Sequence, residues 1–212
     1  MFIPKQEKKT TKRCAHNIDL FYQFFIESND ARVNAIVSFF GDMNGKKVLD
    51  VGCGAGRFPR VLKNRFKKIN LYGLDIAEKK LRYCPRGIRI VCGSMRHICY
   101  PDNYFDSVYC VEALEYVRTI EEPIKEMVRV LKPLGKIIII DKNRDAPAHV
   151  RKLLKADPWG RWFRPKGIMG LLEKCGIRAF SKILPYDKRS IFHNLFIAWE
   201  GVKVASWKQG KN

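Results

Sequence analysis

The stretch 48-VLDVGCGAG-56 decides the fold, because a short apolar run leads into three alternating glycines, Gly52, Gly54 and Gly56. Residues 47–51 predict a buried strand, and residues 58–66 predict a helix behind the glycines. Glycines permit a tight strand-to-helix turn and a close approach of the backbone to a ligand, while the free N–H groups of a helix start favour an anionic group. The stretch therefore predicts either a ligand-binding turn or a structural turn of the same composition.

The spacing of the glycines differs from the dinucleotide fingerprint. That fingerprint has its third glycine at the sixth position, which is Arg57 here, whereas Gly56 occupies the fifth. A second predicted strand at 70–74 ends at Asp75, which follows Asp50 by 25 residues. An acid at that place can accept hydrogen bonds from both hydroxyls of a ribose. The spacing between Asp50 and Asp75 therefore predicts a nucleoside ligand. The alternative is that Asp75 is an ordinary surface residue at a strand end.

Strands alternate with helices through the middle of the chain. Asp30 predicts an N-cap for a helix that ends at Gly41. Further strands are predicted at 88–92, 105–111 and 136–141, and a helix at 120–131. Such alternation implies βαβ units and a parallel sheet that is covered on both faces.

The C-terminal part breaks this alternation. A helix at 167–174 is followed by predicted strands at 178–184 and 192–199. A parallel crossover needs a dozen or more residues, so these two strands must run antiparallel. We divide the chain into a basic arm with an N-terminal lid helix (1–29) and one α/β domain (30–212).

Four stretches together resemble the class I S-adenosylmethionine-dependent methyltransferases, in the methyltransferase type 11 group that includes the ubiquinone-biosynthesis enzymes. They are VLDVGCGAGRF, LYGLDIA, GSMRHICYPDNYFDSVYCVEALEYV and VRVLKPLGKIIIID. The resemblance covers roughly residues 30–200. It implies a Rossmann-like, doubly wound, mostly parallel seven-stranded sheet with an antiparallel C-terminal hairpin, and S-adenosylmethionine as cofactor. The motifs are specific for the cofactor and poorly specific for the substrate.

The resemblance also implies cofactor-binding residues. The methionine part would lie on the glycine turn, with Asp50 orienting that turn. Asp75 would bind the ribose hydroxyls, and Ile76 and Met95 would pack on the two faces of adenine. Ser94 stands where the family often has Asp, which would weaken the bond to the adenine amino group. The full predicted set is Asp50, Gly52, Cys53, Gly54, Gly56, Asp75, Ile76, Ser94, Met95 and Cys110.

The fourth predicted strand ends in the acidic run C-V-E-A-L-E-Y at 110–116. Ligands of open α/β sheets bind beyond the carboxyl ends of the strands, so Glu112, Glu115 and Tyr116 are the predicted catalytic residues. The two glutamates would share a face if the run is helical. The run resembles a metal-binding E-x-x-E-H, but Tyr116 replaces the histidine, and we predict no metal. The glutamates could act as a base, bind an amine, or be solvated acids at a helix start. His97 and His193 are possible bases by residue type alone.

The charge is strongly positive. Lys and Arg number 41 against 21 Asp and Glu, a net charge of +20. This favours a nucleic-acid or membrane-surface partner, or else a solvated basic surface. Residues 101–126 reverse the sign, with seven acids against two bases.

Cysteine usage and hydropathy bear on location. Seven cysteines without a C-x-x-C predict reduced thiols rather than disulfides or zinc. No apolar run is long enough for a membrane span, and residues 1–13 lack an apolar signal core, so a cytoplasmic protein is expected.

Two aromatic segments are candidate lids over an acceptor. Arg161 to Arg164 alternate cation and aromatic, either for base stacking or phosphate binding or as an apolar anchor. Phe21, Tyr22 and Phe25 lie in a predicted N-terminal helix (18–26). The sequence favours a methyltransferase acting on N or O of a small molecule. The alternatives are an RNA (tRNA or rRNA) methyltransferase and a non-catalytic S-adenosylmethionine-binding protein.

Overall fold

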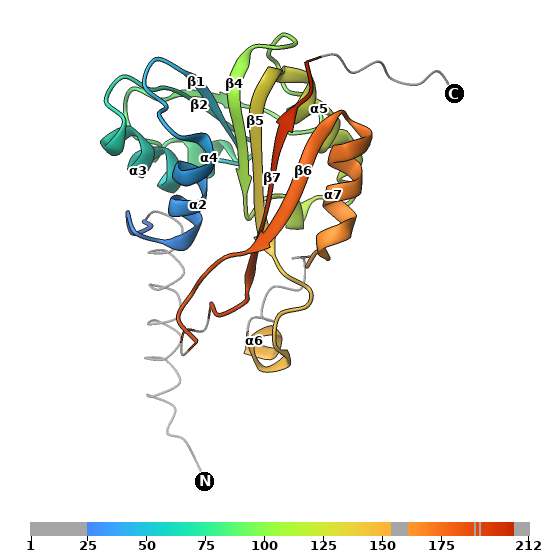
Figure 1. Cartoon of the computed structure of the whole chain (residues 1–212). Helices are drawn as coiled ribbons and strands as arrows, with labels where there is room; N and C mark the ends of the chain where they lie inside the picture. Colours follow the sequence, from blue (N-terminus) through green and yellow to red (C-terminus); the bar gives the residue numbers. More distant parts are fainter. Residues whose placement is uncertain (1–24, 154–160, 189, 191, 206–212) are drawn as a thin grey trace, which may run out of the picture.

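A seven-stranded sheet forms the centre of the computed structural model, which describes residues 25–153, 161–188, 190 and 192–205 (Figure 1). The strands are β1 (Lys47–Val51), β2 (Asn70–Asp75), β3 (Arg89–Cys92), β4 (Phe105–Val111), β5 (Leu131–Lys142), β6 (Ile177–Ile183) and β7 (Phe196–Lys203). Their spatial order is β3-β2-β1-β4-β5-β7-β6. Strands β1 to β5 are parallel, and β7 is antiparallel to both neighbours. The predicted α/β class with an antiparallel C-terminal hairpin is confirmed.

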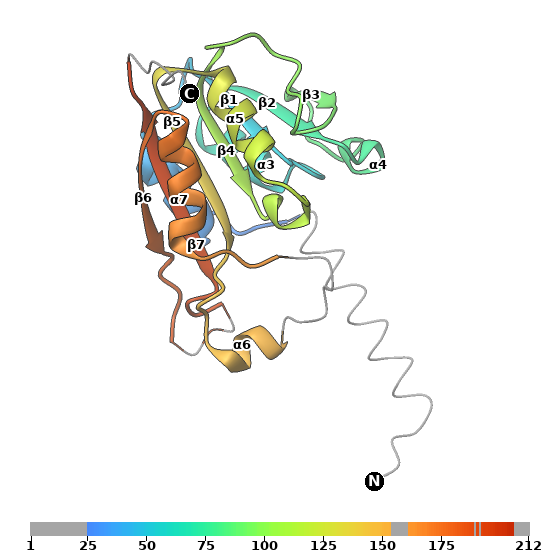
Figure 2. The same cartoon turned by 90° about the vertical axis from the view of Figure 1, so that its right-hand side faces the viewer.

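Helices cover both faces of this sheet (Figures 1 and 2). They are α2 (Ala31–Phe40), α3 (Arg57–Arg65), α4 (Glu78–Leu81), α5 (Glu121–Val130), α6 (Ala148–Leu153) and α7 (Pro165–Lys174), with a 3₁₀ helix η1 (Leu114–Tyr116). The apolar run of β5 shows the two-sided packing. Ile137 and Ile139 lie in the core with α5 and α7, while Ile138 and Ile140 lie in the core with α2 and α3. Because both faces are buried, this strand is apolar at successive positions.

The boundaries of α2 follow from its capping residues. The Asp30 carboxylate accepts a hydrogen bond from the Arg32 backbone N–H at 2.8 Å, as an N-cap residue does. Gly41 ends the helix, and its N–H donates to the Val37 carbonyl. Both predicted ends of this helix are confirmed.

Two strand boundaries differ from the prediction. Residues 192–195 form a turn in which Asn194 has a φ of 56°, so β7 begins at Phe196 and not at residue 192. Strand β5 begins at Leu131, which pairs with Phe105 before the register shifts. The predicted start at residue 136 was wrong because residues 131–135 belong to the strand, and its register against β4 shifts between Leu131 and Lys136.

The strand order reverses between β1 and β4, and this reversal places a ligand site. Strand β1 leads outward to β2 on one side, whereas β4 lies on its other side. The carboxyl ends of β1 and β4 are therefore adjacent, and the turns after them meet. Open α/β sheets bind ligands at this switch point.

Several predictions fall on parts outside the described residues. These parts include the basic arm, residues 18–24 of the predicted lid helix, Phe21 and Tyr22, whereas the last predicted residues of that helix, Phe25 and Ile26, are described and are not helical. The division into 1–29 and 30–212 stays a prediction. Within the described residues the cysteines are free thiols, and no helix there is long and apolar enough to cross a membrane.

Candidate functional site

The glycine turn joins β1 to α3 and packs against the end of β4. Gly52 has a φ of 83°, and its N–H donates to the Leu74 carbonyl at 2.7 Å. A Cβ at this position would lie 2.3 Å from the Ala113 Cβ. Glycine is therefore required by backbone conformation and by the close approach of the loop that follows β4.

Asp75 ties the end of β2 to the glycine turn. Its Oδ2 accepts from the Gly54 N–H at 2.7 Å, and its Oδ1 accepts from the Ala77 N–H at 2.8 Å. A carboxylate offers about four acceptor positions, so two remain for other donors. Asp75 lines a cleft at this end of the sheet and can accept hydrogen bonds from the hydroxyl groups of a ligand in that cleft.

One cleft of about 1030 Å³ runs along the carboxyl ends of β1, β2 and β4. The predicted cofactor residues that line it are Gly52, Cys53, Gly54, Asp75, Ile76, Ser94 and Met95. Asp50, Gly56 and Cys110 do not line it. Asp50 and Cys110 are buried in the sheet behind the turn, and burial raises the pKa of both groups well above their ordinary values.

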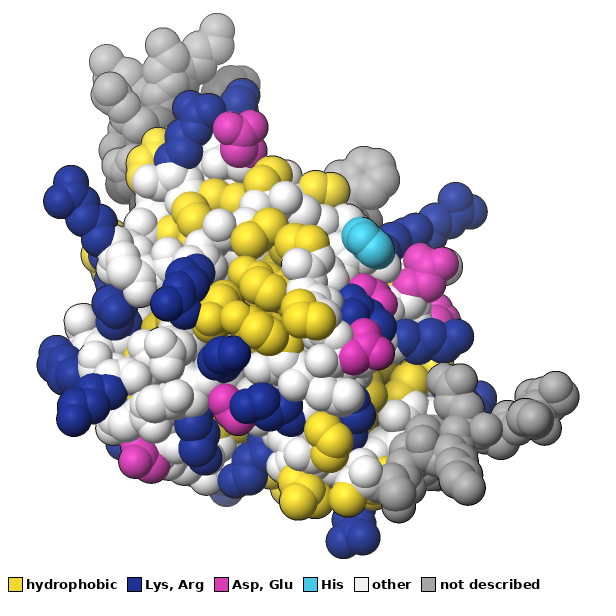
Figure 3. All heavy atoms as spheres, turned by 90° about the horizontal axis from the view of Figure 1, so that it is seen from above, with side chains coloured by type: hydrophobic (Ala, Val, Ile, Leu, Met, Phe, Trp, Pro, Cys, Tyr) yellow, Lys and Arg dark blue, Asp and Glu magenta, His cyan; other side chains and the backbone are white. Residues whose placement is uncertain are grey.

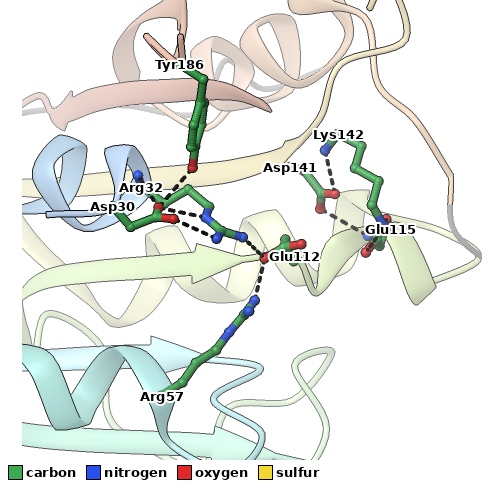
Figure 4. A network of polar contacts seen from close by, with 8 residues as sticks. All are labelled: Asp30, Arg32, Arg57, Glu112, Glu115, Asp141, Lys142 and Tyr186. Carbon is green, nitrogen blue, oxygen red and sulfur yellow. Dashed lines mark hydrogen bonds and ion pairs between the residues drawn. The ribbon is translucent and has the colours of Figure 1, made fainter. Parts of the chain in front are cut away.

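Glu112 lies where α2, α3 and the end of β4 meet (Figure 4). Its Oε2 accepts from the Arg32 guanidinium at 2.6 Å and also from Arg57. Arg32 in turn binds both oxygens of Asp30 at 2.9 Å, and the Tyr186 hydroxyl donates to the same carboxylate. Two cations and two anions thus form one continuous network in which the charges balance.

The two arginines set the protonation state of Glu112. Burial alone would raise the pKa of Glu112, but the charges of Arg57 and Arg32 outweigh burial and lower it. Glu112 is therefore an ionised carboxylate at neutral pH and a weak proton acceptor. Its φ of 50° turns the chain sharply away from β4.

Glu115 belongs to a second network at the end of β5 (Figure 4). Lys142 Nζ donates to both carboxylate oxygens, at 2.8 and 2.6 Å, and the Glu115 N–H donates to Asp141 at 3.2 Å. Burial raises the pKa of Glu115, and Lys142 opposes this shift. Burial and the neighbouring charge of Glu115 raise the pKa of Asp141.

Glu112 and Glu115 do not share a face of one helix. Only Leu114–Tyr116 forms a helical turn, and Glu112 precedes it. The side chains of the two glutamates consequently enter different networks (Figure 4). Tyr116 lines the cleft and is 57% exposed.

Much of the lining of the cleft was not predicted from the sequence. An apolar group from α3 and from the segment before and within β7 lines it: Phe58, Phe192, Leu195 and Phe196. The Arg32 guanidinium stacks over the Phe196 ring at 4.5 Å. Arg57, Arg118 and Lys142 also line the cleft. Arg57 and Lys142 directly follow Gly56 and Asp141, and that adjacency to motif residues was the available signal.

Other predicted candidates lie away from the cleft. No histidine of the described part of the chain lines it, and His193 Nδ1 lies 3.2 Å from the Tyr186 carbonyl. Phe163 pairs by its backbone with Lys142 and packs against Trp199, which supports the apolar-anchor alternative for residues 161–164. Among the described residues no group of three His, Cys, Asp or Glu could hold a metal ion.

The fold and cleft define a class of protein: a Rossmann-like α/β domain with a ligand-sized cleft at the switch point of its sheet. Residues 49–139 match the model of the methyltransferase domain family. The chain is 30% identical over 121 residues to the uncharacterised methyltransferase YdaC of Bacillus subtilis, covering 55% of this chain and 67% of YdaC.

Two further relatives carry named activities. The fatty-acid O-methyltransferase of Mycolicibacterium smegmatis is 32% identical over 54% of this chain and 44% of its own length. The ubiquinone biosynthesis O-methyltransferase of Photorhabdus laumondii is 27% identical over 79% of each chain. The matched region spans about half the length of several curated relatives, including 55% of a Methanocaldococcus jannaschii protein.

Solved structures agree on the fold. An S-adenosylmethionine-dependent methyltransferase from Mesorhizobium loti superposes with a TM-score of 0.68 at 19% identity, covering 82% of this chain and 99% of the other. Geranyl diphosphate C-methyltransferase from Streptomyces coelicolor, solved with S-adenosyl-L-homocysteine, gives 0.67 at 13% identity, covering 82% and 77%. The chain belongs to the class I S-adenosylmethionine-dependent methyltransferases, a family of enzymes whose cofactor is S-adenosylmethionine.

The residues of the cleft fit this cofactor. Asp75 has acceptor positions for ribose hydroxyls, and Ile76 and Met95 offer apolar surfaces beside it for adenine. The glycine turn brings backbone groups to the cleft without side chains in the way. The donor and acceptor groups present are those that an adenosyl amino acid requires.

Proposed function

We propose that this chain transfers a methyl group from S-adenosylmethionine to a nitrogen or oxygen atom of a small-molecule acceptor. The observation that carries the proposal is a single cleft of about 1030 Å³ that holds both the predicted cofactor residues and a separate wall of aromatic and charged side chains. The bound cofactor supplies a methyl group on positively charged sulfur. The protein's part is to hold an acceptor in line with that bond.

The cofactor half of the cleft is assigned to the glycine turn and the ends of β2 and β3. Gly52, Cys53 and Gly54 would hold the methionine part through backbone groups. Asp75 would bind the ribose, and Ser94 would accept from the adenine amino group. Asp50, Gly56 and Cys110 would act from behind, by keeping the shape of the turn.

The acceptor half is assigned to the loop after β4 and the wall that faces it. Tyr116 would contact the acceptor directly, because it lines the cleft and is exposed. Glu112 would act as a positioning residue that joins α2, α3 and β4 through Arg32 and Arg57. Glu115 would hold Lys142 at the cleft.

An RNA acceptor is the second candidate, because the net charge is +20. Lys and Arg side chains are scattered over the face shown in Figure 3, around a central hydrophobic area, and do not form a continuous stripe there. Phosphate contacts make affinity fall steeply with salt. If RNA is the acceptor, we expect saturable binding of a tRNA or rRNA fraction that persists at physiological salt. Loss of all RNA binding at that salt concentration would support a small-molecule acceptor.

The experiment that tests the proposal supplies radiolabelled S-adenosylmethionine to the protein with separate metabolite and RNA fractions. Label in a small-molecule product is the expected result. Label in RNA alone would favour the second candidate. Tight S-adenosyl-L-homocysteine binding without labelled product from any fraction would favour a non-catalytic binding protein. Binding of NAD in its place would overturn the cofactor.

A further inference from the structure

Building on the proposed function, we propose that the acceptor is an apolar carboxylic acid, bound as its carboxylate at Lys142 and Arg118 and methylated on a carboxylate oxygen. The geometry of the acceptor half supports this class over amines and alcohols. Three features carry the inference: the charge of the lining, the apolar wall, and the pairing of both glutamates.

Cations exceed anions along the cleft. Six cationic side chains line it (Arg32, Arg57, Lys80, Arg96, Arg118 and Lys142), whereas its anionic side chains are Asp75, Glu112 and Glu115. In the acceptor half, Glu112 and Asp30 balance the charges of Arg32 and Arg57, and Glu115 pairs with Lys142. Arg118 is exposed at the same edge and makes no ion pair within the described residues. The surplus positive charge of the acceptor half is therefore that of Arg118, which an anionic group complements and a cationic amine does not.

Apolar side chains line the same cleft as these cations. Phe58, Leu195 and Phe196 are at most 4% exposed, and the Arg32 guanidinium stacks over the Phe196 ring. Phe192 and Val117 are half-buried and provide the accessible apolar surface beside Tyr116. Burial of an apolar acceptor body against such a wall stabilises the complex in proportion to the area removed from water. The combination of apolar wall and cationic rim fits a molecule with one anionic end.

The pairing of the glutamates argues for an acceptor that needs no base. Glu112 is held between Arg32 and Arg57, and Glu115 accepts from Lys142 with both oxygens. No histidine of the described residues lines the cleft. An amine or alcohol must lose a proton during methylation, whereas a carboxylic acid is already ionised at neutral pH.

The step balances without a proton acceptor. A carboxylate oxygen forms the new bond to the methyl carbon, and the bond from that carbon to sulfur breaks with its electron pair left on sulfur. The products are a methyl ester and S-adenosyl-L-homocysteine. The negative charge of the acceptor and the positive charge of the sulfonium cancel, and no proton moves.

Three matched probes test the class directly: octanoate, octan-1-ol and octylamine, each titrated into the protein with S-adenosyl-L-homocysteine present. We expect octanoate to bind at least about tenfold more tightly than the other two, from hydrogen bonds to charged groups. With labelled S-adenosylmethionine, we expect octanoate, dodecanoate or cinnamate to yield label that mild alkali releases as methanol, which marks an ester.

Arg118→Ala tests the assigned contact, with Arg82→Ala as its control because Arg82 is an exposed arginine outside the cleft. We expect Arg118→Ala to weaken octanoate binding and raise the KM for the carboxylate by roughly 10-fold. Cofactor affinity and octan-1-ol binding should not change. Unchanged octanoate binding in Arg118→Ala would overturn this contact.

The remaining outcomes separate this inference from the function on which it rests. Alkali-stable label on amines, alcohols or RNA, with none on the carboxylates, would overturn the carboxylate class and leave methyl transfer intact. No label on any acceptor, despite cofactor binding, would overturn both.

Discussion

At the scale of single residues, the position of Glu112 between two guanidinium groups determines what its carboxylate can do. An isolated buried carboxylate would be destabilising, and here Arg32 and Arg57 compensate it. The same contacts make it a weak base. Its value to the protein lies in joining three elements around the cleft.

Replacement of Glu112 with Gln tests this network. We expect the free energy of unfolding at pH 7 to fall by up to about 3–5 kcal/mol, because two arginine charges lose their shared partner. The pKa of Glu112 is lowered in the folded state from an ordinary value of 4.5. Its stabilisation is therefore present above that value and is lost as pH falls through the lower folded-state value.

Urea unfolding of both proteins between pH 7 and pH 3 measures this dependence. The difference between wild type and Glu112→Gln should be full at pH 7 and shrink below about pH 4. The exposed Glu78, paired with Arg82 at 3.5 Å, provides the control Glu78→Gln, for which we expect a change near zero. A difference that stays constant over the whole range would contradict the assignment.

Glu115→Gln tests whether a glutamate acts as the base. Loss of a general base lowers the rate by about 10²–10⁴-fold. Because Lys142 occupies both oxygens, we expect kcat within about tenfold of wild type and unchanged cofactor affinity. A chelator should have no effect on activity. A loss of 10²-fold or more, with the fold intact by circular dichroism, would instead identify Glu115 as the base.

Asp75→Ala tests the cofactor half. We expect S-adenosyl-L-homocysteine binding to weaken by about 1–3 kcal/mol, the range for loss of hydrogen bonds to a charged group. Calorimetry measures the change, and Asp187→Ala, outside the cofactor cleft, is its control. Equal affinity in wild type and Asp75→Ala would exclude the ribose contact.

At the scale of elements, the turn between β1 and α3 depends on the loop after β4. Gly52→Ala would set a Cβ 2.3 Å from that of Ala113, at a φ of 83°. We expect this variant to lose cofactor binding and stability together. Gly170→Ala, in α7 with open space around it, should instead stabilise by roughly 0.5–1 kcal/mol. Thermal unfolding and calorimetry on both variants give the comparison; a tolerated Gly52→Ala would contradict the tight contact.

At the scale of the whole molecule, the net charge of +20 affects stability. Excess like charge destabilises the compact state by self-repulsion, and salt screens that repulsion. We expect the Tm to rise between 20 and 200 mM NaCl (about 21 and 7 Å of Debye screening). A Tm that falls over this range would show that surface ion pairs outweigh the repulsion.

The sequence by itself predicted the sheet and most of the residues that we assign to the cofactor half of the cleft. Those features depend on local causes: an apolar run of strand length, glycines in a turn, and an acid at the end of the next strand. The residue at which β7 begins could not be predicted from the local sequence. Phe192 and Leu195 are as apolar as strand residues, yet they lie in a turn before Phe196.

Only the tertiary structure shows which side chains meet in the part of the cleft that we assign to the acceptor. Asp30 and Arg32 are about 80 residues before Glu112, and Tyr186 lies more than 70 after it, yet all of them meet in one network. The sequence placed Glu112 at a strand end but could not show that two arginines neutralise it. Such pairing depends on distances between elements that no local pattern encodes, and it decides whether a carboxylate serves as a base or as a structural anion.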